Sequence, residues 1–180
     1  MTRTMAGAFV GLALLAASAS AQSAVATEPF TIGFSAGMSV PGGDFSSVAK
    51  SGYNLSGMVE YSGATLPVSF RGEGQWQQFG IKGATGSFKV LTALANVVYP
   101  IPTSGPVTPY ATGGLGAASI PFNGKRGIRF AYDLGVGVRF QVRTVASFAE
   151  LNWQSIEASG ASLRQFPIRV GVRLSPSFDF

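Results

Sequence analysis

The sequence contains no cysteine and no histidine among its 180 residues. Disulfide bonds, thiolate nucleophiles and the usual zinc sites are therefore excluded, as is acid–base chemistry that depends on histidine. Charged residues make up only 12% of the chain, against about 25% in typical soluble domains. No long run of lysine and arginine occurs, so nucleic-acid binding is not indicated. We expect no catalytic residue, no metal ligand and no cofactor.

Two remaining patterns could suggest chemistry, and both have a simpler interpretation. Glu60 and Glu73 could form the paired carboxylates of a glycoside hydrolase, but Arg71 lies between them and favours charge neutralisation. The glycine-rich stretches 113–116 and 135–137 lack the spacing and the following helix of a phosphate-binding loop. We therefore predict a non-enzymatic protein, in which these glycines leave room for arginine or tyrosine side chains in a narrow interior.

The first 21 residues have the pattern of a signal peptide. Arg3 supplies a positive start, residues 5–17 an apolar core, and Ala19 and Ala21 the small residues of a cleavage site. The apolar core is too short to cross about 30 Å of hydrocarbon comfortably as a helix. We predict three segments: a signal peptide at 1–21, a short periplasmic tail at 22–29 and one domain at 30–180.

The rest of the sequence alternates between apolar and small or polar residues, in segments separated by clusters of glycine, serine, proline and asparagine. Glycine is abundant, with 24 residues, and no useful helical periodicity occurs after residue 26. This pattern predicts strands joined by hairpins. We expect eight strands, at 30–40, 52–61, 66–79, 88–99, 107–119, 128–141, 145–155 and 165–174.

The expected connections between these strands alternate in length. Those after the second, fourth and sixth strands are tight or proline-rich, whereas the others are longer and polar. Outer-membrane barrels combine short periplasmic turns with longer outer loops, and their strands have similar lengths. We therefore expect both chain ends in the periplasm. The loop at 120–127 combines a basic pair with Phe122; it is either a contact for lipopolysaccharide phosphates or a host ligand, or simply a solvated loop.

The last expected strand, at 165–174, has two faces of clearly different polarity. Its apolar residues share one parity, and Arg169, Gly171 and Arg173 share the other. Successive side chains of a strand point to opposite faces, so one face is continuously apolar. A soluble barrel would turn that face inward, and a membrane barrel would turn it toward lipid.

Charge placement favours the membrane barrel. The minor face of the strands carries both signs of charge, mixed with small and amide residues, and is rich in arginine, which suits buried pairing better than lysine does. The hairpin register places Glu150 near Arg169, with Asp133 within reach of both. We expect this network to fill the lumen as a plug, or alternatively to act as a switchable gate. Its predicted members are Glu60, Arg71, Glu73, Arg129, Asp133, Arg139, Glu150, Arg169 and Arg173.

Aromatic residues gather at both ends of the expected strands, as in the girdles of membrane barrels. We assign Tyr61, Tyr99, Tyr110 and Phe140 to the turn end. We assign Tyr53, Trp76, Phe79, Phe88, Phe130, Tyr132, Trp153 and Phe166 to the loop end.

Several of these stretches resemble a known family. The relevant stretches are 90–99 with Asn96 and Tyr99, 109–116, 134–140, and Glu150 with the final aromatic residue. They are similar to the small eight-stranded outer-membrane barrels of the OmpX/Ail-like and OmpA transmembrane-domain-like type. The resemblance implies an all-β, antiparallel, up-and-down transmembrane barrel in the cell outer membrane. It also implies a monomer that contacts outer-membrane lipid and lipopolysaccharide, and that uses periplasmic chaperones and the barrel-assembly machinery during biogenesis.

The resemblance also implies an assembly signal in the last strand, because the assembly machinery reads a C-terminal strand with a terminal aromatic residue. Its expected residues are Phe166, Ile168, Val170, Gly171, Val172, Leu174 and Phe180. Pro176 departs from this pattern, so the strand ends either at Leu174 or at Phe180.

Three functions are compatible with the sequence. The leading hypothesis is a barrel that stabilises the envelope or presents loops for adhesion. The second is a narrow channel for small solutes with an ion-paired lumen. The third is a soluble, lipocalin-like barrel that carries an apolar ligand.

Overall fold

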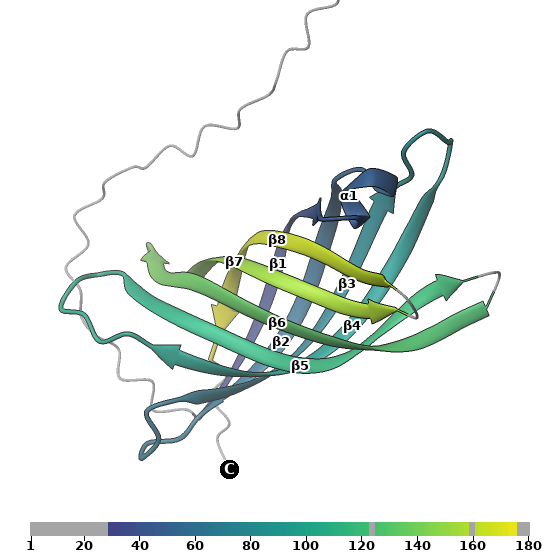
Figure 1. The fold of residues 1–180 in the computed structure, drawn as a ribbon. Coiled ribbons are helices and arrows are strands. Elements are labelled where there is room, and N and C mark those ends of the chain that lie inside the picture. The colour runs from purple at the N-terminus through teal and green to yellow at the C-terminus, as the bar shows by residue number, and fades with distance from the viewer. Residues whose placement is uncertain (1–28, 123–124, 159–160, 176–180) are drawn as a thin grey trace, which may run out of the picture.

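The computed structural model describes residues 29–122, 125–158 and 161–175. The predicted signal peptide with Ala19 and Ala21, most of the predicted periplasmic tail, and Phe180 lie outside the described residues. Within them, eight strands form a closed barrel (Figure 1), in which each strand pairs with its sequence neighbours and β1 pairs with β8. The strands are β1 Phe30–Gly42, β2 Gly52–Ser62, β3 Ser69–Gly80, β4 Ser87–Pro100, β5 Thr108–Phe122, β6 Lys125–Val142, β7 Val145–Ala158 and β8 Ala161–Leu174.

All eight pairings are antiparallel, including the one that closes the barrel. The β1–β8 register runs from Ile32 opposite Leu174 to Gly42 opposite Arg164. This closure leaves neither β1 nor β8 as an open edge, as a barrel in lipid requires. The predicted all-β, eight-stranded, up-and-down architecture is therefore confirmed.

The two faces of the strands differ sharply in polarity. Large apolar side chains point outward and remain exposed, with Phe34 at 56% and Leu134 at 61%. The inward parity holds buried charged and amide side chains, such as Arg71 and Gln77. A soluble barrel that carries an apolar ligand needs the reverse arrangement. The structure therefore contradicts the lipocalin-like alternative.

The connections differ from the prediction at three places. β3 begins at Ser69 rather than at 66, because the segment at 66–68, with Pro67, lies in the β2–β3 turn. The predicted loops at 120–127 and 156–163 are also wrong, since β5 continues to Phe122, β6 begins at Lys125, β7 continues to Ala158 and β8 begins at Ala161. The sequence is Asn-Gly at 123–124 and Ser-Gly at 159–160, and such dipeptides favour two-residue hairpin turns.

The expected contrast between short turns and long loops is confirmed at β6–β7, where only residues 143–144 separate the strands, and at β1–β2, where residues 43–51 do. It is wrong for the other connections. The β2–β3 and β4–β5 connections at one end are longer than the β5–β6 and β7–β8 connections at the other. We call the end with the chain termini the turn end, and the opposite end the loop end. At the loop end the β5–β6 hairpin extends past its neighbours, because β4 pairs with β5 only as far as Ser119 and β7 pairs with β6 only from Ala131.

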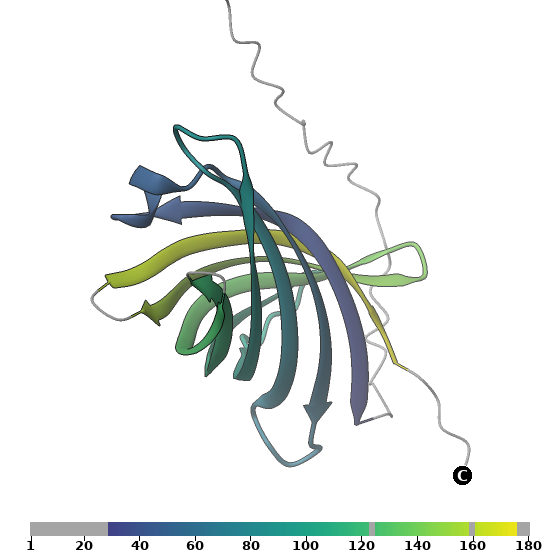
Figure 2. The ribbon, with the colours of Figure 1, turned by 90° about the vertical axis from the view of Figure 1, so that its right-hand side faces the viewer.

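One short helix, α1 (Phe45–Val48), lies in the β1–β2 connection. It packs beside the β3–β4 connection at the loop end (Figure 2), where the backbone N–H of Lys82 donates to the carbonyl of Val48 over 2.8 Å. The backbone N–H of Lys50 donates to the carbonyl of Gly80, also over 2.8 Å. No helix in the described part of the chain is long and apolar enough to cross a membrane.

Candidate functional site in the barrel lumen

The lumen changes character from the turn end to the loop end. Along β3 the inward residues are Arg71, Glu73, Gln75, Gln77 and Phe79, in that order. β7 repeats the order on the opposite wall, with Glu150, Asn152, Gln154 and Ile156. The lumen therefore contains a charged layer, an amide layer and an apolar layer, stacked along the barrel axis.

Glu60 anchors the charged layer near the turn end. Its carboxylate is fully buried and accepts hydrogen bonds from three arginines. Arg71 donates to one carboxylate oxygen through Nε and Nη2, both over 3.1 Å. Arg139 and Arg173 donate to the other oxygen over 2.7 Å and 3.1 Å. These bonds connect β2 with β3, β6 and β8.

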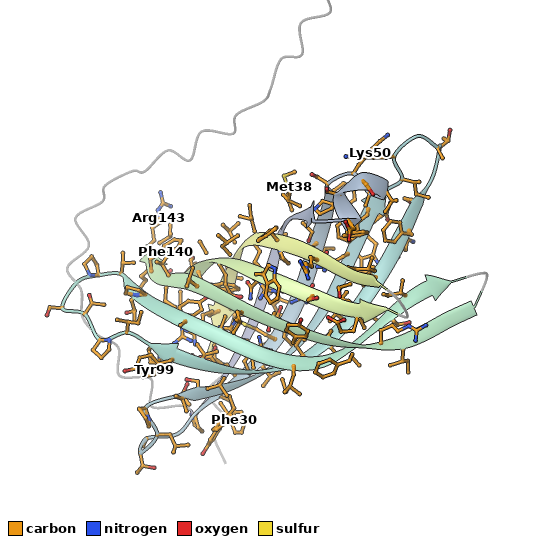
Figure 3. The ribbon with its side chains drawn as sticks, in the orientation of Figure 1. Phe30, Met38, Lys50, Tyr99, Phe140 and Arg143 are labelled. Atoms are coloured by element: carbon orange, nitrogen blue, oxygen red, sulfur yellow. The ribbon has the colours of Figure 1, made fainter. Side chains whose placement is uncertain are left out.

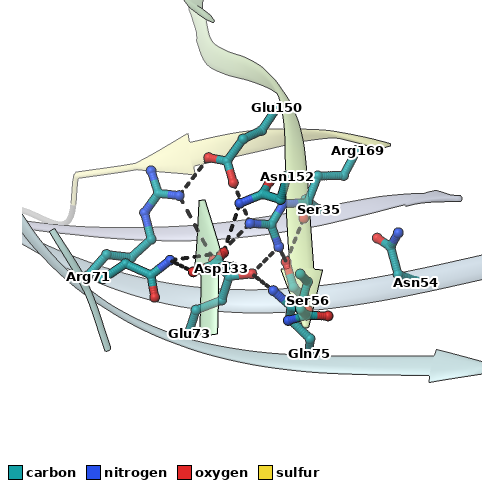
Figure 4. Close-up of polar contacts among 12 residues, drawn as sticks. Ser35, Asn54, Ser56, Arg71, Glu73, Gln75, Asp133, Glu150, Asn152 and Arg169 are labelled. Atoms are coloured by element: carbon teal, nitrogen blue, oxygen red, sulfur yellow. Dashed lines mark hydrogen bonds and ion pairs between the residues drawn. The ribbon is translucent and has the colours of Figure 1, made fainter. Parts of the chain in front are cut away.

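Glu150 and Glu73 continue the network across the lumen (Figure 4). Arg71 of β3 donates to Glu150 of β7 over 2.7 Å. Arg169 of β8 forms ion pairs with both Glu150 and Glu73. Glu60, Glu73 and Glu150 therefore each face at least one guanidinium, which satisfies the requirement that charges removed from water must be paired.

Tyr110 belongs to this network rather than to an aromatic girdle, so that part of the prediction is wrong. Its side chain is only 1% exposed, and its hydroxyl donates to Glu150 over 2.6 Å. The guanidinium carbons of Arg71 and Arg139 lie 5.6 Å and 4.9 Å from the centre of its ring. A Cβ atom at Gly137 would lie 2.4 Å from the Tyr110 ring, so the missing side chain makes room for this tyrosine.

Asp133 is inward but does not join the ion pairs, contrary to the expectation that it lies within reach of Glu150 and Arg169. Its carboxylate accepts hydrogen bonds from the side-chain amides of Asn96, over 3.1 Å, and Asn152, over 2.9 Å. Among the residues that the structure describes, no arginine lies within ion-pair distance of Asp133. Amide donors from β4 and β7 therefore satisfy this carboxylate.

Arg129 lies apart from the other predicted members. It sits on the long β6 strand toward the loop end, opposite Ala118, and is only partly buried. Within the described ranges, no carboxylate forms an ion pair with it. The lumen thus brings together seven of the predicted residues as ion pairs, and leaves Asp133 and Arg129 outside them.

The amide layer was not predicted as a site. Gln165 of β8 donates to Gln77 of β3 over 2.8 Å and also to Gln154 of β7. Gln154 donates in turn to Gln75 over 3.1 Å. All four glutamines are buried. Their shared inward parity is visible in the sequence, but only the closed barrel brings strands so distant in sequence into contact.

An apolar cluster closes the loop end of the lumen. Phe45 of α1 packs against Phe79 and Phe88, with ring centres 5.2 Å and 5.8 Å apart. The cluster places Phe79 and Phe88 inside the barrel rather than in the predicted outer girdle, because they share the inward parity of Gln77 and Val90. Its buried members are Phe45, Ala49, Phe79, Val90, Leu94, Ala118, Ala131 and Ile156.

The predicted assembly residues up to Leu174 lie on β8, some pointing outward and one inward. The apolar ones point outward and are exposed, namely Phe166, Ile168, Val170, Val172 and Leu174. Gly171 points inward beneath the ring of Phe148, where a Cβ atom would lie 2.5 Å from that ring. β8 ends at Leu174, and Phe180 lies outside the described residues.

The lumen offers little for catalysis. Glu60 and Glu73 each accept hydrogen bonds from arginine, so neither is free to exchange protons with a substrate. No group of three or more His, Cys, Asp or Glu residues in the described segments is arranged to hold a metal ion. What the arrangement can do is hold opposite walls together, because the bonds from Arg71 to Glu150, from Arg139 to Glu60 and from Arg169 to Glu73 run between strands that are not neighbours.

The geometry agrees with a comparison of sequences. The sequence pattern of the outer membrane protein beta-barrel domain matches residues 9–174 of this chain. The chain belongs to this family. Its apolar outer face is therefore the surface that contacts the lipid of the outer membrane. No curated protein matches the chain in sequence.

Solved structures of this kind of barrel are similar in fold but distant in sequence. Neisserial surface protein A (NspA) is 18% identical, with a TM-score of 0.61 over 82% of this chain and 97% of its own. The N-terminal β-barrel domain of Pseudomonas aeruginosa OprF is 14% identical, with a TM-score of 0.50 over 82% and 98%. The Yersinia pestis outer membrane protein Ail is 15% identical, with a TM-score of 0.50 over 80% and 99%. At these identities the similarity establishes the fold alone.

Proposed function

We propose that this chain is a non-enzymatic barrel that stabilises the outer membrane and conducts no solutes. The observation that carries the proposal is the set of bonds across the lumen. Arg71 of β3 reaches Glu150 of β7, Arg139 of β6 reaches Glu60 of β2, and Gln165 of β8 reaches Gln77 of β3. An eight-stranded barrel has an interior just wide enough to be filled by side chains, and these bonds fill it.

Envelope stabilisation fits the connections better than loop-mediated adhesion does. The loop end lacks long outer loops at β5–β6 and β7–β8, where the strands are separated only by residues 123–124 and 159–160. The segment at 120–127, considered above as a ligand-binding loop, belongs largely to β5 and β6. An adhesive surface at the loop end would therefore consist of the extended β5–β6 hairpin and the β1–β2 and β3–β4 connections.

A planar-bilayer recording together with an envelope test examines this proposal. The purified protein should show no stable conductance, and a strain that lacks the gene should become more sensitive to detergent and to large antibiotics. Restoring the wild-type gene should restore resistance. Stable conductance steps from the wild-type protein, or unchanged sensitivity of the deletion strain, would contradict the stabilising role.

A narrow channel is the second candidate, and one observation favours it. The side chains of Arg139 and Arg173 remain 17% and 15% exposed at the turn-end mouth, so water reaches the edge of the charged layer. If Glu150 and Arg169 form a gate, replacing either residue with alanine should raise conductance. Variants that insulate as well as the wild-type protein would remove the gate.

We infer the route to the membrane from the sequence. In this proposal residues 1–21 are a signal peptide cleaved after Ala21, residues 22–29 remain in the periplasm, and the monomeric barrel is delivered by periplasmic chaperones to the assembly machinery. The outward apolar stripe of β8 would be the surface that the machinery reads. Deleting residues 175–180 tests this: assembly at the wild-type level would place the end of the signal at Leu174, and failed assembly would assign it to Phe180.

A further inference from the structure

Among the lumen carboxylates that the structure describes, Asp133 alone has no cationic partner. It lies deep inside the barrel, because it is 1% exposed and its strand continues past it to Phe140, near the turn end in Figure 3. Hydrogen bonds from Asn96 and Asn152 occupy its oxygens but bring no charge. An ionised carboxylate in such a position needs a positive partner, since it has lost its hydration.

The arginines of the lumen do not provide this partner. Arg71 and Arg169, drawn with Asp133 in Figure 4, are both bound to glutamates. The surplus positive charge lies at the turn-end mouth instead, where three arginines meet at Glu60. With Asp133 ionised, the middle of the charged layer therefore contains more negative than positive charge.

Several uncharged oxygens near Asp133 are buried without a hydrogen-bond partner in the described part of the chain. They are Asn96 Oδ1, Asn152 Oδ1 and Thr112 Oγ1. Thr112 is linked to Asn152 in the strand register through Gly135, which faces both. Buried polar atoms nearly always have a partner, so a group of unsatisfied oxygens requires a donor or a cation. We call Asp133, Asn96, Asn152 and Thr112 the oxygen cluster.

Two glycines bring the oxygen cluster together. Asn96, Gly114 and Asp133 lie opposite one another in one row, and Gly135 and Asn152 pair in the next inward row. A Cβ atom at Gly114 would lie 2.4 Å from Asn96 Oδ1, and one at Gly135 would lie 2.6 Å from Asn152 Nδ2. Both asparagines therefore lie over a missing side chain, and this lets their amides reach the carboxylate.

A half-turn of each amide would convert these donors into ligands. The Nδ2 atoms of Asn96 and Asn152 lie 2.9–3.3 Å from the carboxylate oxygens of Asp133. The torsion about the Cβ–Cγ bond of asparagine is broad and roughly two-fold, so each Oδ1 atom can take the position of its Nδ2. Amide oxygens would repel a bare carboxylate, but a cation between them attracts both. Oxygens this close together surround a small cation better than a large one.

We propose that the oxygen cluster binds one sodium ion, held by the Asp133 carboxylate, the two asparagine amide oxygens and the Thr112 hydroxyl oxygen. A single carboxylate among neutral oxygens balances a monovalent ion, whereas calcium usually takes more oxygen ligands, several of them carboxylates. The ion would neutralise the middle of the charged layer. It would also connect β4, β5, β6 and β7, whether or not the barrel conducts.

Urea unfolding of the barrel in lipid vesicles tests the sodium site. The protein is folded and unfolded in NaCl, KCl or choline chloride of equal ionic strength, so that screening is constant and no ion has to enter a closed lumen. Sodium at about ten times its dissociation constant should raise the folded-to-unfolded ratio roughly tenfold above its value in choline chloride. Potassium should have a much smaller effect.

Asp133→Asn and Asn152→Leu should each abolish the difference between NaCl and choline chloride. The first removes the charge and the second removes an amide ligand at similar size, so Asn152→Leu keeps the test valid if Asp133→Asn does not fold. Glu157→Gln is the matched control, because Glu157 lies near the end of β7 and outside the oxygen cluster. It should respond to sodium like the wild-type protein.

Equal wild-type midpoints in NaCl and choline chloride would overturn the site, as would a sodium response that survives in either variant. A midpoint that changes with pH but not with the cation would assign the neutralising charge to a proton and likewise overturn it. Potassium acting as strongly as sodium would overturn the choice of ion.

Discussion

Glu60 is the residue on which most lumen charge converges. Three guanidinium groups meet at one carboxylate, from β3, β6 and β8. A buried ion pair contributes little net stability when compared with an apolar pair of similar shape, but removing one partner leaves the other charged and unsatisfied. The three arginines would then also repel one another at short range.

Glu60→Gln should therefore lower the free energy of unfolding by about 3 kcal/mol. The glutamine keeps the size of the side chain and one acceptor oxygen, so the effect reports the lost charge. Urea unfolding followed by tryptophan fluorescence in lipid vesicles measures it. Glu157→Gln is the control, because Glu157 lies near the end of β7, away from the lumen arginines, and accepts hydrogen bonds from the hydroxyls of Ser155 and Ser162; its unfolding midpoint should not move. Equal midpoints for the two variants would show that the charge on Glu60 is not important for stability.

Gly137 offers a test of packing without any change of charge. A Cβ atom there would lie 2.4 Å from the Tyr110 ring and 2.8 Å from the carbonyl oxygen of Ala149. Tyr110 would have to move away from Glu150, which breaks a buried hydrogen bond. Gly137→Ala should cost about 2 kcal/mol in unfolding experiments. Gly72→Ala adds the same methyl group on the outer face with nothing within 4 Å, and a loss of similar size there would contradict the packing argument.

At the scale of the elements, the sequence predicted the number of strands and their faces, because alternation has the period of a strand. It did not predict where β5 to β8 end at the loop end. Glycine, serine and asparagine near 123 and 159 indicate a turn equally well for a long loop and for a two-residue hairpin. The length of the connection depends on how far the two strands remain paired, and this register cannot be read from either strand alone.

The same limitation explains which lumen residues could be predicted. Arg71, Glu150 and Arg169 stand out because charged residues on a strand flanked by apolar neighbours demand an explanation. Tyr110 does not, since an aromatic residue near a strand end also fits a girdle, and its parity is obscured by the surrounding glycines. Asp133 lies on the inward face, as predicted. Its hydrogen-bond donors depend on which side chains are closest in the folded barrel, and these are asparagines.

The helix α1 illustrates an element that depends entirely on tertiary contacts. Four residues are too few to form a stable helix alone, so Phe45 must hold α1 in place through Phe79 and Phe88. Phe45→Ala should raise hydrogen exchange across residues 43–51 by at least tenfold and leave the ion-paired half of the barrel protected. Val48→Ala is the matched control, since Val48 belongs to the same helix but is 56% exposed. If both variants exchange at the wild-type rate, the aromatic contact does not hold the helix.

At the scale of the whole molecule, the usual arrangement of a globular protein is inverted. Apolar side chains cover the outside, while the interior is charged near the turn end, amide-rich in the middle and most apolar beneath α1. Stability in a bilayer then depends on two separate terms, which are the transfer of the outer face into lipid and the pairing of the polar interior. A substitution can change one of them without the other.

Leu134→Arg separates these two terms. Leu134 lies at the middle of β6, is 61% exposed and points away from the lumen network. An arginine at the middle of the bilayer costs about 2–4 kcal/mol, whereas one near the interface costs about 0–1 kcal/mol. Ile128, on the same strand and parity but near the loop end, is 78% exposed, so Ile128→Arg is the depth control. Folding into vesicles, measured by urea titration, should be weakened strongly by Leu134→Arg and little by Ile128→Arg.

In detergent micelles, which deform around a charge, the two variants should differ less. Equal losses in vesicles would mean that Leu134 does not lie at the centre of the membrane, and the position of the barrel in the bilayer would have to be shifted toward the turn end or the loop end.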